Sequence, residues 1–145
     1  MVAISVKTIK LWRNEVENKP GALTSTLEPL ARAGSDLQLI MGYPCPGNET
    51  KASIGLYPVA GKKSTAAAQS AGLSTSPISA LLVEGTNRPG LGHAIAKEIS
   101  KAGINTIFLV ANVIGRQYSA VFGFENDEDA GKATALIKKA AAARK

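Results

Sequence analysis

The chain has 145 residues, of which 45% are hydrophobic and 19% are charged, and its formal net charge is +6. These proportions are typical of a globular protein, and no apolar run approaches the roughly 18 residues of a membrane span. The single cysteine, Cys45, excludes an internal disulfide and a metal site built from several cysteines. Basic residues are spread evenly over both halves, whereas a nucleic-acid-binding protein usually concentrates them on one stripe.

The first half of the chain is predicted to fold as strand, helix, strand, strand, helix and strand. Its first helix follows the turn Asn18-Lys19-Pro20-Gly21, and Pro29 should kink that helix. A loop is expected from Gly42 to Thr50 because it holds Pro44, Cys45 and Pro46. The predicted strands are residues 10–16, 37–41, 52–57 and 73–78, and the second helix is 62–71.

The second half repeats this order but ends after its second helix. Leu91, Ile95 and Ile99 mark the buried stripe of its first helix, which Gly103 should end as a left-handed cap. Asn126 is predicted to cap the last helix. The predicted strands are residues 79–85, 106–114 and 118–124, and the last helix is roughly 129–143.

An internal repeat underlies this similarity. Asn18-Lys19-Pro20-Gly21 returns 69 residues later as Asn87-Arg88-Pro89-Gly90, and Ala33-Gly34-Ser35-Asp36 returns as Ala102-Gly103-Ile104-Asn105. We therefore expect an α+β protein of two ferredoxin-like βαββαβ units, each with an antiparallel sheet and helices on one face. The expected domains are residues 7–78 and 79–145. The surplus apolar segment at 2–6 should supply the fourth strand of the second domain.

The turn before the first helix of each half is predicted to attract an anion. A helix N-terminus offers unpaired N–H groups and a partial positive charge, and the Pro-Gly pair lets the backbone approach a bound group. Asn87 precedes the helix of the second half and Asn105 follows it, and we expect both at the same end of the sheet. Helix capping is the commoner reason for Asn at this position, so the residues alone leave both roles open.

The stretch Glu84-Gly85-Thr86-Asn87-Arg88-Pro89-Gly90, with Ala102-Gly103-Ile104-Asn105, resembles the ACT domain. It is most similar to the serine-sensing regulatory domain of phosphoglycerate dehydrogenase, and the likeness covers the whole chain as two tandem copies. The resemblance implies modules that pair side by side and bind an amino acid at the seam without transforming it. The implied ligand-binding residues are Asn87, Arg88, Pro89, Gly90, Leu91 and Asn105 in the second half and Asn18, Lys19, Pro20, Gly21, Ala22 and Asp36 in the first.

The sequence departs from the serine-sensing pattern at two kinds of position. Gly85 and Val16 stand where that pattern has a histidine, so one ligand contact is missing. Asp36 replaces the asparagine of the second half, which would favour an ammonium group over a carboxylate at that place. The identity of the ligand, and whether both halves bind one, stay open.

No pair of carboxylates, metal-ligand cluster or Ser-His-Asp arrangement is recognisable, so we expect no enzyme activity, no metal and no cofactor. Charged residues recur through the first twenty positions, which excludes a signal-peptide core and favours a cytoplasmic protein without membrane contact. The expected partners are a small-molecule ligand, a second copy in a homodimer and an enzyme on which the protein docks as a regulatory subunit. The alternative is an RNA-binding protein, because Tyr118, Phe122 and Phe124 alternate on one predicted strand near Arg116.

Overall fold

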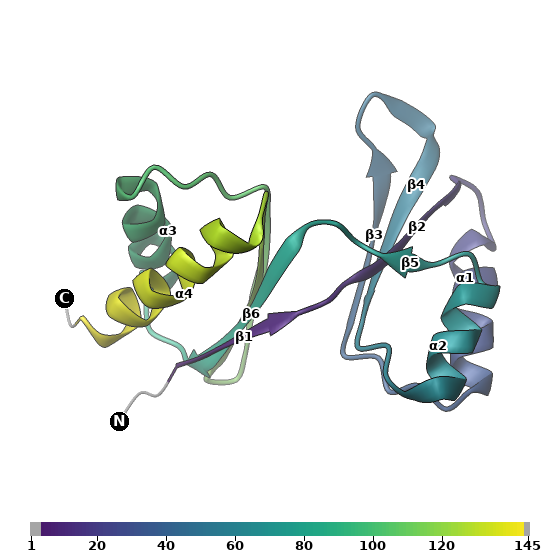
Figure 1. The fold of residues 1–145 in the computed structure, drawn as a ribbon, viewed down its shortest axis with the longest axis horizontal. Coiled ribbons are helices and arrows are strands. Elements are labelled where there is room, and N and C mark those ends of the chain that lie inside the picture. The colour runs from purple at the N-terminus through teal and green to yellow at the C-terminus, as the bar shows by residue number, and fades with distance from the viewer. Residues whose placement is uncertain (1–3, 144–145) are drawn as a thin grey trace. The chain divides into compact units, whose positions relative to one another are not determined.

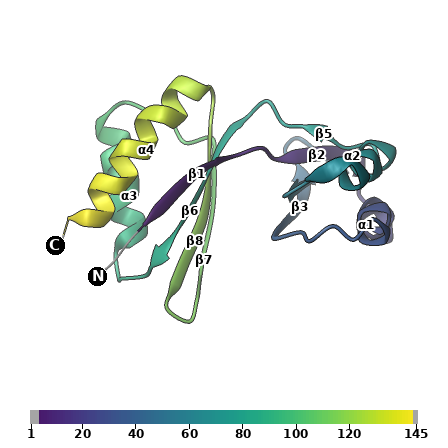
Figure 2. The same ribbon diagram turned by 60° about the horizontal axis from the view of Figure 1, so that its bottom comes forward.

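A computed structural model describes residues 4–143. Residues 10–77 form one compact unit, here called the contiguous unit. The described residues up to Ile9 join those from Ile78 onward in a second compact unit, the split unit. In each unit two helices cover one face of a four-stranded sheet (Figures 1 and 2).

The contiguous unit has antiparallel strand pairs in the order β3-β4-β2-β5. Leu30, Leu56 and Ala68 are fully buried between this sheet and its helices. The elements are β2 (Trp12–Glu17), α1 (Ala22–Arg32), β3 (Leu39–Cys45), β4 (Asn48–Tyr57), α2 (Gly61–Ser70) and β5 (Ser74–Thr75).

The split unit has the same plan, with the strand order β1-β6-β8-β7 and every neighbouring pair antiparallel. Its helices α3 and α4 pack together on one face of the sheet (Figure 2). The elements are β1 (Ser5–Ile9), β6 (Ser79–Thr86), α3 (Leu91–Lys101), β7 (Phe108–Ile114), β8 (Gln117–Phe124) and α4 (Asp127–Ala142).

The predicted α+β fold with two ferredoxin-like units is confirmed, and the deviations from the expected elements are local. The loop predicted from Gly42 to Thr50 is wrong, because β3 and β4 continue through it as a hairpin that turns at Gly47. Pro44 is tolerated there because β3 is an edge strand, where a missing N–H leaves no ladder bond unmade. Helix α1 continues through Pro29 to Arg32.

Strand β1 is the segment of the N-terminal region that joins the sheet of the split unit. It pairs antiparallel with β6, from Ser5 opposite Glu84 to Ile9 opposite Ala80. The strand expected at residues 2–6 is instead Ser5–Ile9, so Ile4 does not belong to it, and Val2 and Ala3 lie outside the described residues. Because five residues of β1 pair with β6, the chain leaves the split unit after Ile9 rather than after residue 6.

The two cores differ in size. Among the described residues, the buried cluster of the contiguous unit holds five hydrophobic residues, and that of the split unit holds fifteen. The split unit gains from Phe122 and Phe124, whose rings stack with their centroids 6.4 Å apart, and from alanines of α4 that let this helix approach the sheet. None of the helices in residues 4–143 is long and apolar enough to span a membrane.

Candidate ligand site

The turn between β2 and α1 forms an open corner of the contiguous unit. Its last residue, Gly21, is the N-cap of α1 and has a φ of 91°, a left-handed conformation that a side chain would strain. No side chain caps the helix, and its first turn holds no acidic residue. The N–H groups of Leu23 and Thr24 have no hydrogen-bond partner among the described residues, so the corner favours an anion.

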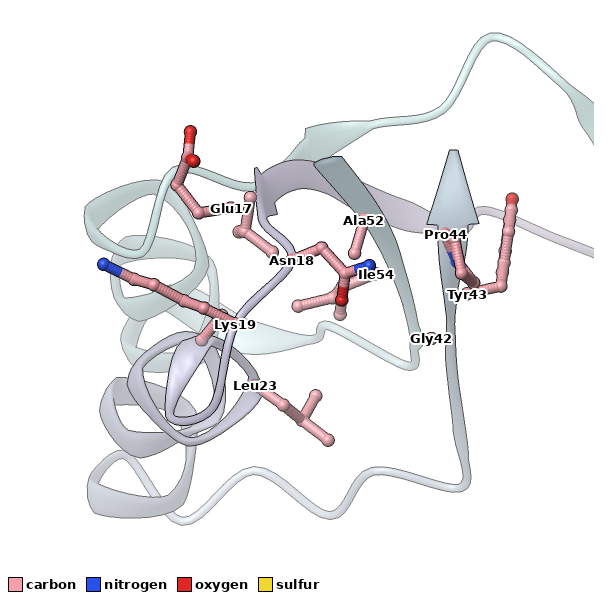
Figure 3. Close-up of a pocket in the computed structure, with 11 residues that line it drawn as sticks. Glu17, Asn18, Lys19, Leu23, Gly42, Tyr43, Pro44, Ala52 and Ile54 are labelled. Carbon is pink, nitrogen blue, oxygen red and sulfur yellow. The ribbon is translucent and has the colours of Figure 1, made fainter. Parts of the chain in front are cut away.

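A cavity of about 260 Å³ lies beside this corner, between α1 and the hairpin of β3 and β4 (Figure 3). In Figure 3 the side chain of Leu23 points from α1 toward β3, whereas the end of Lys19 points away from it. The floor is apolar because Ala52 and Ile54 lie on the helix-facing side of β4. The lining residues are Val16, Glu17, Asn18, Lys19, Ala22, Leu23, Gly42, Tyr43, Pro44, Ala52 and Ile54.

Asn18 fastens the turn to the start of β4. Its backbone N–H donates to the carbonyl oxygen of Thr50 at 2.9 Å, and its side-chain Nδ2 donates to the carbonyl oxygen of Glu49 at 2.8 Å. Its Oδ1 accepts no hydrogen bond from the residues that the structure describes. Asn18 therefore holds the corner in place and still has one acceptor for a ligand.

The charges at the rim of the cavity are largely paired. The Lys51 ammonium lies 2.6 Å from the Glu17 carboxylate. The hydrogen bond and charge of Lys51 lower the pKa of Glu17, and Glu17 in turn raises the pKa of Lys51. Both side chains are solvent-exposed, so this pair leaves the cavity itself without a buried charge.

The equivalent corner of the split unit is closed. Val16 and Gly85 are equivalent in the repeat, and their strand partners are therefore equivalent as well. Val16 pairs with Ala52, and Gly85 pairs with Tyr118. Tyr118 of the split unit is thus equivalent to Ala52, which lines the cavity of the contiguous unit. Leu91 is likewise equivalent to Ala22, because the two are 69 residues apart, the spacing of the repeat. Tyr118 is 4% exposed and Leu91 is 2% exposed, and both belong to the core of the split unit.

Arg88 binds away from this corner. Its guanidinium donates hydrogen bonds to the carbonyl oxygens of Ala140 at 2.9 Å and Ala143 at 3.0 Å, at the end of α4. Carbonyl groups at a helix C-terminus generally lack partners within the helix, and a cation there also complements the helix dipole. Asn87 holds the turn as Asn18 does, because its backbone N–H donates to the carbonyl oxygen of Arg116 at 2.7 Å.

We expected Asn105, which follows α3, to lie at the same end of the sheet as Asn87, which precedes it. Within the split unit this prediction is wrong. The N–H of Asn87 donates to the carbonyl oxygen of Arg116, just before β8. The N–H of Ile107, two residues after Asn105, donates to that of Gly123, near the other end of β8. Seven residues of strand separate these points by about 23 Å. The physical reason is that α3 runs back along the sheet, so its two ends lie at opposite ends of the sheet.

Asp36 is separated from Asn18 in the same way. The N–H of Gln38, two residues after Asp36, donates to the carbonyl oxygen of Tyr57 at one end of β4, and that of Asn18 donates to Thr50 near the other. Asn105 and Asp36 are both exposed. Neither therefore completes the corner of its own unit.

Several lining residues were not singled out from the sequence. Tyr43 and Pro44 come from the hairpin that was expected to be a loop, and Ala52 and Ile54 read as ordinary strand residues. The signal that could have found them is the alignment of the two repeats, which assigns the small Ala52 and the large Tyr118 to equivalent positions. It becomes readable only once the strand register is known.

Two further hollows are less suited to a ligand. One of about 260 Å³ lies on the other side of α1 and shares Val16, Glu17, Lys19 and Ala22 with the first. The other, of about 410 Å³, lies between α3 and α4. There Glu98 is paired with Lys101 and Lys139, at 3.7 and 3.6 Å. No group of three or more potential metal ligands occurs within residues 4–143.

No protein-family model matches the chain, and no curated protein matches it either. Solved structures do match along almost its whole length. Protein BT0572 from Bacteroides thetaiotaomicron has a TM-score of 0.73 at 18% identity, with 92% of this chain and 89% of that chain covered.

Two regulatory subunits of aspartate kinase are also similar. That of Thermus thermophilus, solved in a ligand-free form, has a TM-score of 0.64 at 12% identity over 95% of this chain and 97% of that chain. That of Thermus flavus has a TM-score of 0.60 at 14% identity over 96% and 95%. At these identities the similarity establishes the fold, which is shared by chains of the same extent.

Proposed function

We propose that the chain is a non-catalytic regulatory protein that binds an amino acid at the corner between β2 and α1. The observation that carries the proposal is the cavity of about 260 Å³ beside an uncapped helix N-terminus. The fold supports it, because chains of the same extent and fold include regulatory subunits of aspartate kinase. The resemblance of the repeated turn to amino-acid-sensing ACT domains points the same way.

The ligand carboxylate would sit on the N–H groups of Leu23 and Thr24, which have no partner among the described residues. The Oδ1 of Asn18 would accept a hydrogen bond from the ligand's ammonium group. Pro20 and Gly21 would shape the turn, while Lys19 and Ala22 would line its mouth. A ligand that joins the turn to the β3–β4 hairpin makes the unit more rigid, and that change can be passed to a partner.

We also propose that two copies of the chain associate and that the pair regulates an enzyme. Edge strand β7 exposes apolar side chains, with Leu109, Val110, Val113 and Ile114 between 41% and 74% exposed. An exposed apolar edge of this kind is a template for pairing with another strand. Val110→Lys should then shift the protein toward the monomer in analytical ultracentrifugation, and an unchanged sedimentation profile would count against this edge.

The burial of the aromatic side chains on β8 argues against the RNA-binding alternative. Base stacking needs exposed aromatic rings on the central strands. Tyr118, Phe122 and Phe124 are instead 4%, 1% and 0% exposed, inside the core of the split unit. The basic residues are also spread over both halves, so no concentrated surface for a phosphate backbone is evident from the sequence.

The test is a thermal-shift screen of the twenty amino acids followed by calorimetric titration, because a ligand that binds the native state raises its stability. Asn18→Ala should weaken a hit by about tenfold, the effect of one lost hydrogen bond of about 1.4 kcal/mol. Asn87→Ala, at the equivalent turn of the split unit, is the matched control and should leave binding unchanged. Absence of any hit for the folded protein would refute the proposed ligand class.

A further inference from the structure

We infer that, of the two repeated corners, the one in the contiguous unit is the ligand site, and that Ala22 and Ala52 shape it for an aliphatic amino acid. The inference rests on the proposed function and deepens it. It names the class of side chain that the site accepts and the two residues that set it. Under this inference the contiguous unit binds the ligand, and the split unit does not.

The two corners differ in the volume that their side chains fill. The cavity beside α1 holds about 260 Å³, the space of about nine water molecules at about 30 Å³ each. Replacing two alanines by a leucine and a tyrosine adds about ten non-hydrogen atoms, which is enough to fill a space of that size. The split unit carries that replacement, as Leu91 and Tyr118, and buries both side chains.

The second step is the close fit of the filled corner. A Cβ added to Gly92, in the first turn of α3, would lie 3.9 Å from the hydroxyl oxygen of Tyr118, so the tyrosine reaches under the start of the helix. That hydroxyl has no hydrogen-bond partner among the described residues. Tyr118 therefore occupies the place beneath α3 that corresponds to the open place beneath α1.

The third step is the chemistry of the open cavity. Its floor is apolar, made by Val16, Leu23, Pro44, Ala52 and Ile54, whereas the polar residues that also line it, Glu17, Asn18, Lys19 and Tyr43, are exposed. The one charged pair nearby lies at the exposed rim and is already satisfied. A polar ligand side chain that lies on this floor would lose its hydration without gaining a partner among the floor residues, which costs free energy. A ligand of about nine non-hydrogen atoms with an apolar side chain matches the lining and the volume, as leucine and isoleucine do.

The experiment is calorimetric titration of the full-length protein with leucine, isoleucine and valine, and with aspartate, lysine and threonine. We expect the aliphatic amino acids to bind with one site per chain and the polar ones to bind at least about 100-fold more weakly, in line with the discrimination of an apolar pocket. Ala52→Tyr should abolish binding by rebuilding the closed corner. The matched control is Ala96→Tyr at an exposed position of α3, outside the cavity lining, which should bind as the unchanged protein does.

Ala52→Val keeps the test decisive if the tyrosine variant does not fold. Its two added carbons should weaken leucine more than valine and so shift the preference toward the smaller ligand. Tight binding of polar amino acids, or two sites per chain, would overturn the inference while leaving the proposed function intact. If no amino acid binds, the proposed function falls with it, and hydrogen exchange of α1 would confirm that the protein tested was folded.

Discussion

The contiguous and split units share one plan, yet one keeps an open corner and the other is packed to its edge. In the split unit, Phe122 and Tyr118 fill the space between sheet and helices, and fifteen buried residues of its described part form one cluster. In the contiguous unit, Leu56 and Ala52 occupy the equivalent strand positions, and the cluster holds five among the described residues. The closed corner makes packing contacts that the open corner lacks, because the atoms that line a hollow have no partners on one side.

The edge strands show the same division. Strand β3 carries Pro44 and a register shift between Pro44 and Cys45, devices that discourage pairing with another strand. Strand β7 has neither proline nor a register shift, and it exposes a run of apolar side chains. The unit with the open cavity therefore has a protected edge, and the unit with the closed corner has the edge suited to a partner.

The largest expected effect tests the difference between the cores. Phe122→Ala should lower the free energy of unfolding of the split unit by about 3–5 kcal/mol, and the equivalent Leu56→Ala should cost about 2–5 kcal/mol in the contiguous unit. We expect the phenylalanine to cost more, because its ring also stacks on Phe124. Denaturant titration measures each change, and hydrogen exchange assigns it to a unit. Equal costs at both sites would contradict the contrast between the cores.

Arg88 and Lys19 provide the next comparison, since they occupy the same place in the repeat. Arg88→Ala should destabilise the split unit by about 1.5–3 kcal/mol, because two carbonyl groups of α4 lose a charged donor. Lys19→Ala, at an exposed position, should change stability by less than about 0.5 kcal/mol. Thermal unfolding of the two variants decides the matter, and a similar loss in both would show that Arg88 has no special anchoring role.

The buried hydroxyl of Tyr118 gives a smaller effect of the opposite sign. Burial raises the pKa of this group, and it has no partner in the described part of the chain. Tyr118→Phe should therefore stabilise the split unit by about 1 kcal/mol. Tyr43→Phe is the control, because Tyr43 is 49% exposed. Destabilisation by Tyr118→Phe would mean that the hydroxyl has a bonding partner after all, such as a bound water.

The smallest effect concerns the rim of the cavity. Because the Lys51 ammonium lowers the pKa of Glu17, the pair stabilises the fold above the unfolded-state pKa of Glu17. That contribution is lost as the pH falls through the folded-state pKa. Lys51→Ala should raise the pKa of Glu17 toward its ordinary value, as followed by NMR titration of the side-chain carbon. An unchanged pKa would show that the two side chains do not pair in solution.

Local signals in the sequence account for most of the elements. Asn126 does cap α4, with its side chain accepting a hydrogen bond from the N–H of Asp129 at 2.8 Å, and Gly103 does adopt a left-handed conformation after α3. The repeat and the alternation of apolar residues were enough for the fold class. These features depend on neighbours within a few residues, which a sequence displays directly.

The candidate site depended on information that the sequence does not display. The cavity exists because Ala52 lies opposite Val16, and that register is set by the whole β2–β4 pairing. Arg88 finds its partners 52 and 55 residues away, at the end of another helix. The placement of Asn105 failed for a third reason, since it needed the direction in which α3 crosses the sheet.

Strand β1 has a consequence for how the protein is made. Its partner, Ser79–Thr86, is synthesised about 70 residues later, so during translation Ser5–Ile9 must wait unpaired while residues 10–77 emerge and can already fold. The contiguous unit can thus fold on the ribosome before β1 of the split unit has its partner strand.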